Sequence, residues 1–450
     1  MKRIVICFDG TWNSVSDPAS VTNVVRVTQA VQSVASDKVP QIVYYQTGVG
    51  SEGRIDRLLG GVFGVGLRNN VKRALAFLTL NWNDENDEIY VFGFSRGAYS
   101  ARALAGVINA VGGIPRQEHF DRLEEFWDFY RIDPKVRNDP KNAQSVAKKA
   151  EMRKMCYPDE KDTQPIIKLL GVWDTVGSYG IPAGLGLGGL ARKLTSWTKG
   201  FHDNEFGRHV KYGLHAMAID ERRRAFPPTA WTIEKGKQLP ATQSVEQVWF
   251  TGAHSNIGGG YKESGLSDLA LIWMMSRAQE LGGLDFDTQY IGDNFWPCSA
   301  CALYRSNRKW LVSTVFPYRR RVLSQKPAAK LKDGRIMENI NEKLHWSVME
   351  RRGKLAIVDE TMHREYRPRN LPKTIADDMV TGGYPQGETA GKGPIGKEAE
   401  FIQACRDSTS NKRHERCVLF RTLDFNAKDK RGRGLTKMQE VWMRGVPPPI

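Results

Sequence analysis

The run Glu88-Ile89-Tyr90-Val91-Phe92-Gly93-Phe94-Ser95-Arg96-Gly97 decides the fold of this chain. Its apolar first half predicts a buried strand, and the small-residue run Ala98 to Val111 predicts a helix. Strand, Gly-x-Ser-x-Gly and helix in this order are the setting of a nucleophile elbow. The glycines fit because larger side chains would collide with the neighbouring strand and helix. Ser95 is therefore the candidate nucleophile.

Two polar residues follow predicted strands further along the chain. Ile166–Trp173 reads as a strand that ends at Asp174, and Val245–Phe250 leads to His254, which opens a glycine-rich loop. A serine nucleophile needs a base and an orienting acid, and the order Ser, Asp, His is that of α/β-hydrolases. Taken alone, Asp174 also fits a helix N-cap and His254 a core histidine. The joint pattern favours a Ser95, Asp174, His254 triad.

The N-terminus supplies candidates for an oxyanion hole. Arg3–Phe8 predicts a strand, and in this architecture one backbone N–H follows the serine while another follows an earlier strand. We expect the donors to be Arg96 together with Gly10 and Thr11. The Asp-Gly-Thr loop also resembles haloacid-dehalogenase-like phosphatases, but the position of their nucleophilic aspartate is Cys7 here.

Alternating strands and helices in the first 112 residues predict an α/β fold with a doubly wound, mostly parallel sheet. Two insertions break the alternation, and we expect them to form a helical cap near 113–164 and a lid near 178–210. The segment 283–365 is predicted to pack over the site, and 380–400 to be a loop or disordered linker. The expected elements are strands at 3–8, 41–46 and 88–93 and helices near 21–34, 66–80, 98–111, 120–130 and 266–282.

The chain resembles the α/β-hydrolase domain of type VI secretion phospholipase effectors, formerly a domain of unknown function. The resemblance implies a catalytic domain over 1–372 that hydrolyses carboxylic esters, phospholipids above all, through an acyl-enzyme and without cofactor or metal. It also implies an immunity or secretion partner. Residues 373–450 resemble nothing we recognise and are expected to form a basic, partly flexible extension. The blocks that carry the resemblance are 8–13, 93–102, 172–177, 218–223, 226–229, 249–261 and 366–372.

Composition limits the setting. The formal net charge is +16, which fits peripheral contact with an anionic membrane; no motif for nucleic acid accompanies it. The six cysteines suggest no disulfide framework, and no signal peptide or apolar span is evident, which fits the cytoplasm or export without a signal peptide. A non-lipid carboxylesterase and a catalytically inactive binding protein with the hydrolase fold remain as alternatives.

Overall fold

The computed structural model describes residues 1–10, 21–48, 60–82, 86–157, 166–176, 205–223, 226–305, 321, 323, 329–330, 334–358, 362–372, 374–383 and 392–411. Thr11, most of the segment 178–210 and everything after 411 lie outside these ranges. In the described part of the chain, no helix is both long and apolar enough to cross a membrane.

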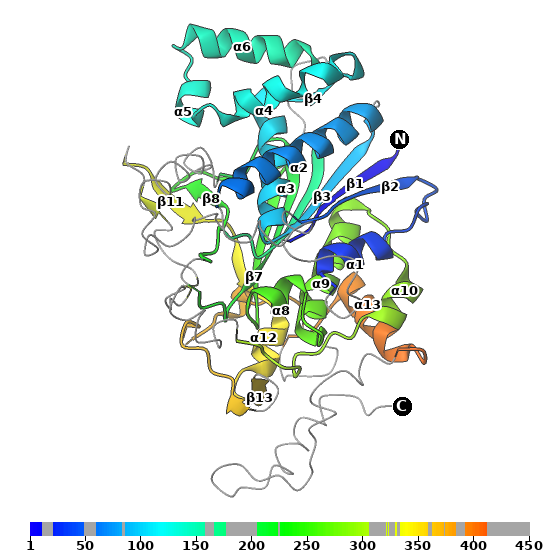
Figure 1. The fold of residues 1–450 in the computed structure, drawn as a ribbon. Coiled ribbons are helices and arrows are strands. Elements are labelled where there is room, and N and C mark those ends of the chain that lie inside the picture. Colours follow the sequence, from blue (N-terminus) through cyan, green and yellow to red (C-terminus); the bar gives the residue numbers. More distant parts are fainter. Residues whose placement is uncertain are drawn as a thin grey trace, which may run out of the picture.

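A seven-stranded sheet forms the centre of the molecule (Figure 1). Its strands are β1 (Arg3–Phe8), β2 (Gln41–Gln46), β3 (Glu88–Phe94), β6 (Ile167–Trp173), β7 (Val210–Ala218), β9 (Ser244–Phe250) and β12 (Glu342–Leu344). They lie in the order β12-β9-β7-β6-β3-β1-β2, and every neighbouring pair is parallel. The predicted α/β fold is confirmed.

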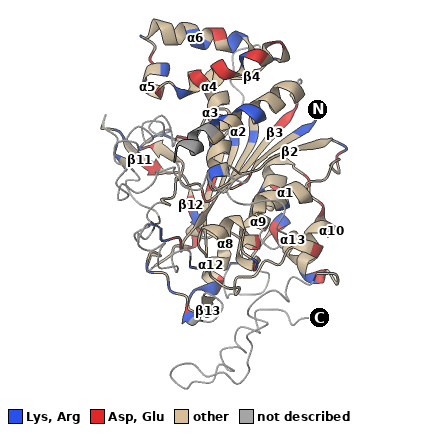
Figure 2. Ribbon diagram, in the orientation of Figure 1, with Lys and Arg blue, Asp and Glu red and all other residues tan. Residues whose placement is uncertain are grey.

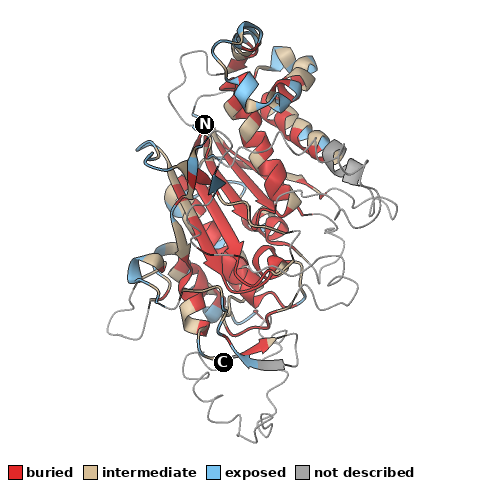
Figure 3. Cartoon of the chain, turned by 90° about the vertical axis from the view of Figure 1, so that its left-hand side faces the viewer, coloured by how far each residue is buried: buried red, intermediate tan, exposed pale blue. Residues whose placement is uncertain are grey.

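Helices cover both faces of this sheet. Successive side chains of a strand point to opposite faces, so Ile6 enters one hydrophobic core and Cys7 the other. Figure 3 shows the sheet and the helices beside it as the buried centre of the protein. The covering helices are α2 (Gly60–Asn81) and α3 (Arg96–Val111) on the Ile6 face, and α1 (Asn23–Ala30) and α9 (Gly265–Gly282) on the other.

The strand order predicts a ligand crevice at the carboxyl ends of β1 and β3. β1 lies between β2 and β3, so the chain winds outward in one direction to β2 and then crosses to the other side to form β3. In open α/β sheets, ligands bind where the winding direction changes. Gly10 and Ser95 follow these two strands closely, and this edge of the sheet is therefore where a site is expected.

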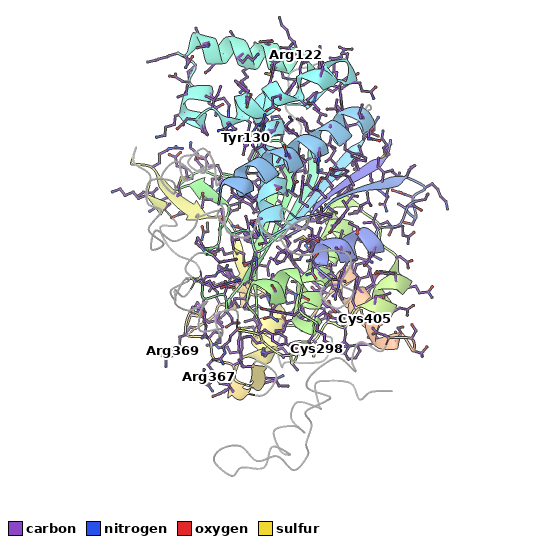
Figure 4. The ribbon with its side chains drawn as sticks, viewed as in Figure 1. Arg122, Tyr130, Cys298, Arg367, Arg369 and Cys405 are labelled. Atoms are coloured by element: carbon purple, nitrogen blue, oxygen red, sulfur yellow. The ribbon has the colours of Figure 1, made fainter. Side chains whose placement is uncertain are left out.

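The insertion predicted near 113–164 is helical, but it lies at the opposite edge of the sheet (Figure 1). α3 runs away from the carboxyl ends of the strands, so the chain that follows it emerges beyond their amino ends. There α4 packs on α2 and α3. Figure 4 places Arg122 and Tyr130 of this insertion far from Arg367 and Arg369. The elements are β4 (Ile114–Pro115), η1 (Gln117–Arg122), α4 (Leu123–Arg131), α5 (Pro134–Arg137), α6 (Ala143–Lys154) and β5 (Cys156–Tyr157).

Ion pairs hold this helical insertion together. Figure 2 shows basic and acidic residues side by side on α4 and α6. Arg122 bonds Glu125 at 2.6 Å, and Lys148 bonds both Glu125 at 2.8 Å and Glu151 at 3.0 Å. Because these groups are partly exposed, each pair contributes about 0–1 kcal/mol. The described residues of the insertion, 113–157, lie beyond the amino ends of the strands rather than over their carboxyl ends, which corrects the expected cap (Figure 1).

The last part of the chain completes the core on the α9 face. Phe401 lies edge-on to Phe286 with ring centroids 6.5 Å apart, and His345 bonds Glu398 at 2.8 Å. The hydrophobic core thus continues past residue 372, and the helix α13 replaces the end of the linker expected at 380–400. The remaining elements are β8 (Thr232–Glu234), α8 (His254–Gly258), α10 (Thr288–Asn294), β10 (Ala329–Lys330), β11 (Ile336–Asn339), α12 (Trp346–Arg351), β13 (Leu355–Val358), β14 (Met362–Glu365), η4 (Asp377–Met379) and α13 (Gly396–Asp407).

Candidate active site

Ser95 occupies a strained turn between β3 and α3. Its backbone has φ 57° and ψ −118°, a conformation that residues other than glycine rarely adopt. The flanking glycines allow the turn to close. A β-carbon on Gly93 would lie 2.5 Å from the Gly97 oxygen, and one on Gly97 would lie 2.5 Å from the Asp9 oxygen and nearer still to that of Phe8. The predicted elbow is therefore present, and it holds Ser95 at the crevice.

His254 bonds the Ser95 hydroxyl. It begins the short helix α8, four residues after β9 ends at Phe250. Its Nε2 lies 2.7 Å from Ser95 Oγ, and its Nδ1 lies 2.6 Å from Asp174 Oδ2. In the neutral tautomer that fits both contacts, Nδ1–H donates to the carboxylate and Nε2 accepts from the hydroxyl. The three residues predicted from separate parts of the sequence thus form one hydrogen-bonded chain.

Asp174 is held as a buried carboxylate. It follows β6 with a φ of 41°, and its Oδ1 accepts the Ala218 N–H at 3.0 Å. Burial raises the pKa of Asp174, but the charge of Arg321 and the hydrogen bond from His254 outweigh burial and hold that pKa well below its usual value. The acid is therefore ionised across the physiological range, as the orienting member of a serine relay must be.

Apolar rings and a second carboxylate surround His254. The Phe94 and Phe226 rings lie 4.7 and 5.2 Å from the imidazole, centroid to centroid. Glu221 Oε2 accepts a hydrogen bond from the main-chain N–H of His254 at 3.3 Å. The same oxygen forms an ion pair with Arg223 Nη2 at 2.9 Å. Burial would raise the pKa of Glu221, but its bonds to Arg223 lower it to about 2. These neighbours restrict the orientation of the imidazole.

The loop after β1 is organised by Asp9. Its carboxylate accepts hydrogen bonds from Thr22 Oγ1 at 2.9 Å, Tyr45 OH at 2.7 Å and the Gly10 N–H at 2.6 Å. Burial dominates over these bonds and raises the pKa of Asp9 to about 6. The Gly10 N–H, expected to face an oxyanion, is thus directed at Asp9. Arg96, the other expected donor within the described residues, begins α3 directly after Ser95.

Two charged residues of the site were not predicted as functional. In the sequence analysis Glu221 lies within the block 218–223 that carries the family resemblance, and Arg321 is not singled out. Arg321 Nη1 and Nη2 donate to the two Asp174 oxygens at 2.5 and 3.0 Å. No local signal in the sequence marks this contact, because the two residues are 147 positions apart.

Comparison with known proteins gives one family match. Residues 2–277 match a family model described as "T6SS, Phospholipase effector Tle1-like, catalytic domain". An uncharacterized protein of Saccharomyces cerevisiae, YEL023C, is 30% identical to this chain over an alignment of 247 residues. The alignment covers 51% of this chain and 33% of that protein. The chain thus spans about a third of the length of this relative.

Two solved structures are similar to part of this chain. The crystal structure of an uncharacterized protein from Pseudomonas aeruginosa gives 17% identity and a TM-score of 0.37, over 62% of this chain and 46% of that one. The structure of the Tle1 effector bound to the VgrG spike from the Type 6 secretion system gives 20% identity and a TM-score of 0.31, over 58% of this chain and 51% of that one. The chain spans about half the length of each.

Proposed function

This chain belongs to the Tle1-like catalytic domain family of type VI secretion phospholipase effectors, and from that premise we propose that it is a serine hydrolase that cleaves phospholipid esters. The observation that carries the proposal is the continuous hydrogen-bonded chain from the Ser95 hydroxyl through His254 to Asp174. Such a chain can move a proton in step with bond formation at a carbonyl carbon.

The proposed reaction has two acyl-transfer steps. His254 Nε2 takes the Ser95 proton while Oγ attacks the ester carbonyl, and Asp174 stabilises the imidazolium that forms. The tetrahedral intermediate collapses, the alcohol leaves with the proton from His254, and Ser95 is left acylated. Water then repeats the sequence and releases the fatty acid. The serine proton leaves with the alcohol, and the attacking water supplies, through His254, the proton that returns to Ser95.

The oxyanion would be stabilised at the start of α3. The Arg96 N–H follows the nucleophile at a helix N-terminus, where backbone donors and the helix dipole favour negative charge. We propose the loop after β1 as the second source of a donor. In it the Gly10 N–H bonds Asp9 in the absence of substrate, and donors of this kind often reorient when substrate binds.

An arginine-lined cavity supports a phospholipid over a neutral ester. The cavity has a volume of about 380 Å³, and Asp220 and Glu221 line it. Glu221 also accepts the main-chain N–H of His254, so this wall of the cavity adjoins the relay. Guanidinium groups bind phosphate oxygens well because their donors match phosphate geometry. We propose that the cavity faces the phosphate of the headgroup at an anionic membrane surface. Its arginines are Arg222, Arg305, Arg364, Arg367 and Arg369.

Hydrolysis assays on two substrates test this function. Release of fatty acid from phosphatidylglycerol vesicles should exceed release from vesicles of neutral lipid, and Ser95→Ala should abolish both. Arg364→Ala should weaken vesicle hydrolysis and leave hydrolysis of p-nitrophenyl butyrate unchanged. Arg131→Ala is the matched control, because Arg131 is exposed on α4 at the opposite edge of the sheet.

The other outcomes identify the alternatives. Hydrolysis of the short ester alone would indicate a non-lipid carboxylesterase. Absence of any Ser95-dependent hydrolysis would contradict the proposal and indicate a binding protein with this fold. The family also supports a proposal that the chain meets a secretion component or an immunity protein, which co-purification from cells producing both would test.

A further inference from the structure

Arg321 binds both oxygens of the Asp174 carboxylate. Nη1 donates to Oδ1 at 2.5 Å and Nη2 to Oδ2 at 3.0 Å, the bidentate arrangement that guanidinium and carboxylate favour. The other Nη hydrogens go to main-chain oxygens, Ala218 at 3.0 Å and Phe226 at 2.9 Å. The Arg321 side chain is 3% exposed and that of Asp174 0%, so the contact is made away from water.

These contacts fix the plane of the carboxylate. Oδ1 accepts from the Ala218 N–H and from Arg321, while Oδ2 accepts from His254 and from Arg321. Rotation of the carboxylate would break at least one bond of the arginine fork. The oxygen that faces His254 is therefore held in place by Arg321, whose own hydrogen bonds go to Asp174, Ala218 and Phe226.

The charge of Arg321 also changes the energetics of the relay. Without it, transfer of the serine proton would take the Asp174–His254 pair from one negative charge to neutral. With it, the three groups go from neutral to one positive charge. The resolved effect of that charge is on Asp174: beside Arg321 the buried carboxyl keeps a pKa well below its usual value and stays ionised.

The other charged or titratable groups around the relay do not duplicate this effect. Glu221, which accepts the main-chain N–H of His254, is paired with Arg223, whose guanidinium lies 3.7 Å from the centroid of the Phe226 ring. His215 is fully buried, and burial lowers its pKa to about 3, so it is neutral. Of these charged groups, Arg321 is the cation that bonds a member of the relay, Asp174.

We propose that Arg321 is a positioning residue of the relay: its two-point contact holds the Asp174 carboxylate in the orientation that bonds His254. The inference rests on the proposed hydrolase function. Arg321 lies beyond residues 2–277 that match the family model, so the family match assigns it no role.

Two substitutions separate the fork from the charge. Arg321→Lys keeps the charge but presents one point donor, so kcat for p-nitrophenyl butyrate should fall by roughly 10- to 100-fold. Arg321→Gln loses the charge as well as the fork, so its kcat should fall further than that of Arg321→Lys. KM should change little in either variant.

A matched control is Arg351→Gln. Arg351 is also fully buried and donates to the main-chain oxygens of Cys301, at 2.7 Å, and Ile357, at 3.3 Å, but it does not bond Asp174. It should lower the thermal midpoint, as Arg321→Gln will, without lowering kcat. All rates are measured below the lowest midpoint of the set.

The results that would overturn the proposal are specific. An unchanged kcat in Arg321→Lys, or a kcat in Arg321→Gln no lower than that in Arg351→Gln, contradicts it. If the glutamine variant does not fold, the kcat of the lysine variant decides. Activity that survives Ser95→Ala would instead refute the hydrolase function, whereas Ser95-dependent activity that ignores Arg321 refutes this inference alone.

Discussion

Replacing Gly97 with alanine would place a methyl group against the end of β1. The new carbon would lie 2.5 Å from the Asp9 oxygen and nearer still to that of Phe8, whereas ordinary contacts begin at 3.4 Å. The first turn of α3 or the end of β1 must therefore move by about 1 Å, the difference between these values. Both carry parts of the site, because Ser95 precedes α3 and Gly10 follows β1.

The expected result is a loss of catalysis larger than the loss of stability. A misplacement of about 1 Å in a catalytic group lowers the rate by roughly 10²-fold, and overpacking of this kind costs about 1–3 kcal/mol. Steady-state hydrolysis of p-nitrophenyl butyrate measures the first quantity, and urea unfolding followed by circular dichroism measures the second. We expect kcat to fall and KM to stay near its original value.

Gly207→Ala is the matched control for this experiment. A β-carbon there would meet only the Asn109 side chain, at 3.4 Å, which is ordinary contact. Gly207 lines a cavity of about 860 Å³ at the amino ends of the strands, away from Ser95. Full activity in Gly97→Ala, with stability equal to that of Gly207→Ala, would refute the assignment of the turn as a catalytic elbow.

Three further substitutions test the charged groups. Asp174→Asn should lower kcat for the same ester by about 10⁴-fold with KM nearly unchanged, because an amide cannot stabilise the imidazolium; a loss below tenfold would remove Asp174 from the relay. Glu221 has its pKa lowered from 4.5 to about 2, so its carboxylate stabilises the folded state by on the order of 3 kcal/mol above pH 4.5, and this contribution is lost as the pH falls through that window. Urea midpoints of Glu221→Gln should therefore converge on those of the original protein between pH 4.5 and 2, and a constant gap would contradict the coupling. Asp9 has its pKa raised from 3.8 to about 6, so the folded state binds the proton more tightly and loses on the order of 3 kcal/mol as the pH rises through that range. Asp9→Asn should remove this slope from the urea midpoints, and a slope that persists would assign it to other groups.

The parts of the fold with strong local signals were predictable. An apolar run that ends at glycine or at a polar residue marks a strand and its carboxyl end, and the predicted strand 88–93 is β3. Asp174 and His254 each follow such a run, which is why their order along the chain identified them. Their arrangement around Ser95 is that expected of a relay, and their catalytic roles stay a prediction.

The parts that depend on distant contacts were not predictable. β7 contains Lys211, Gly213 and His215, which weaken the pattern of a buried strand. His215 is accommodated only because its Nε2 accepts the Thr175 N–H at 3.2 Å and its Nδ1 lies 3.4 Å from the Gln247 side chain. Gln247 belongs to β9 and Thr175 follows β6, so both partners come from distant parts of the chain and no local pattern indicates them.

The position of the helical insertion follows from geometry that the sequence also contained. A helix after the nucleophile runs antiparallel to its strand, so residues beyond Val111 must emerge at the amino ends. The expectation of a cap over the site neglected this direction. Arg321 could not be found in that way, because its partner Asp174 is brought to it by the folding of a separate segment.

Covalent labelling of Ser95 tests the central claim most directly. A fluorophosphonate reacts with a serine only when its proton is removed as it attacks, which is the function assigned to His254. Intact-mass measurement and peptide mapping should find one adduct, on Ser95, and His254→Ala should abolish it. An adduct on another residue, or none in protein that still hydrolyses esters, would contradict the account.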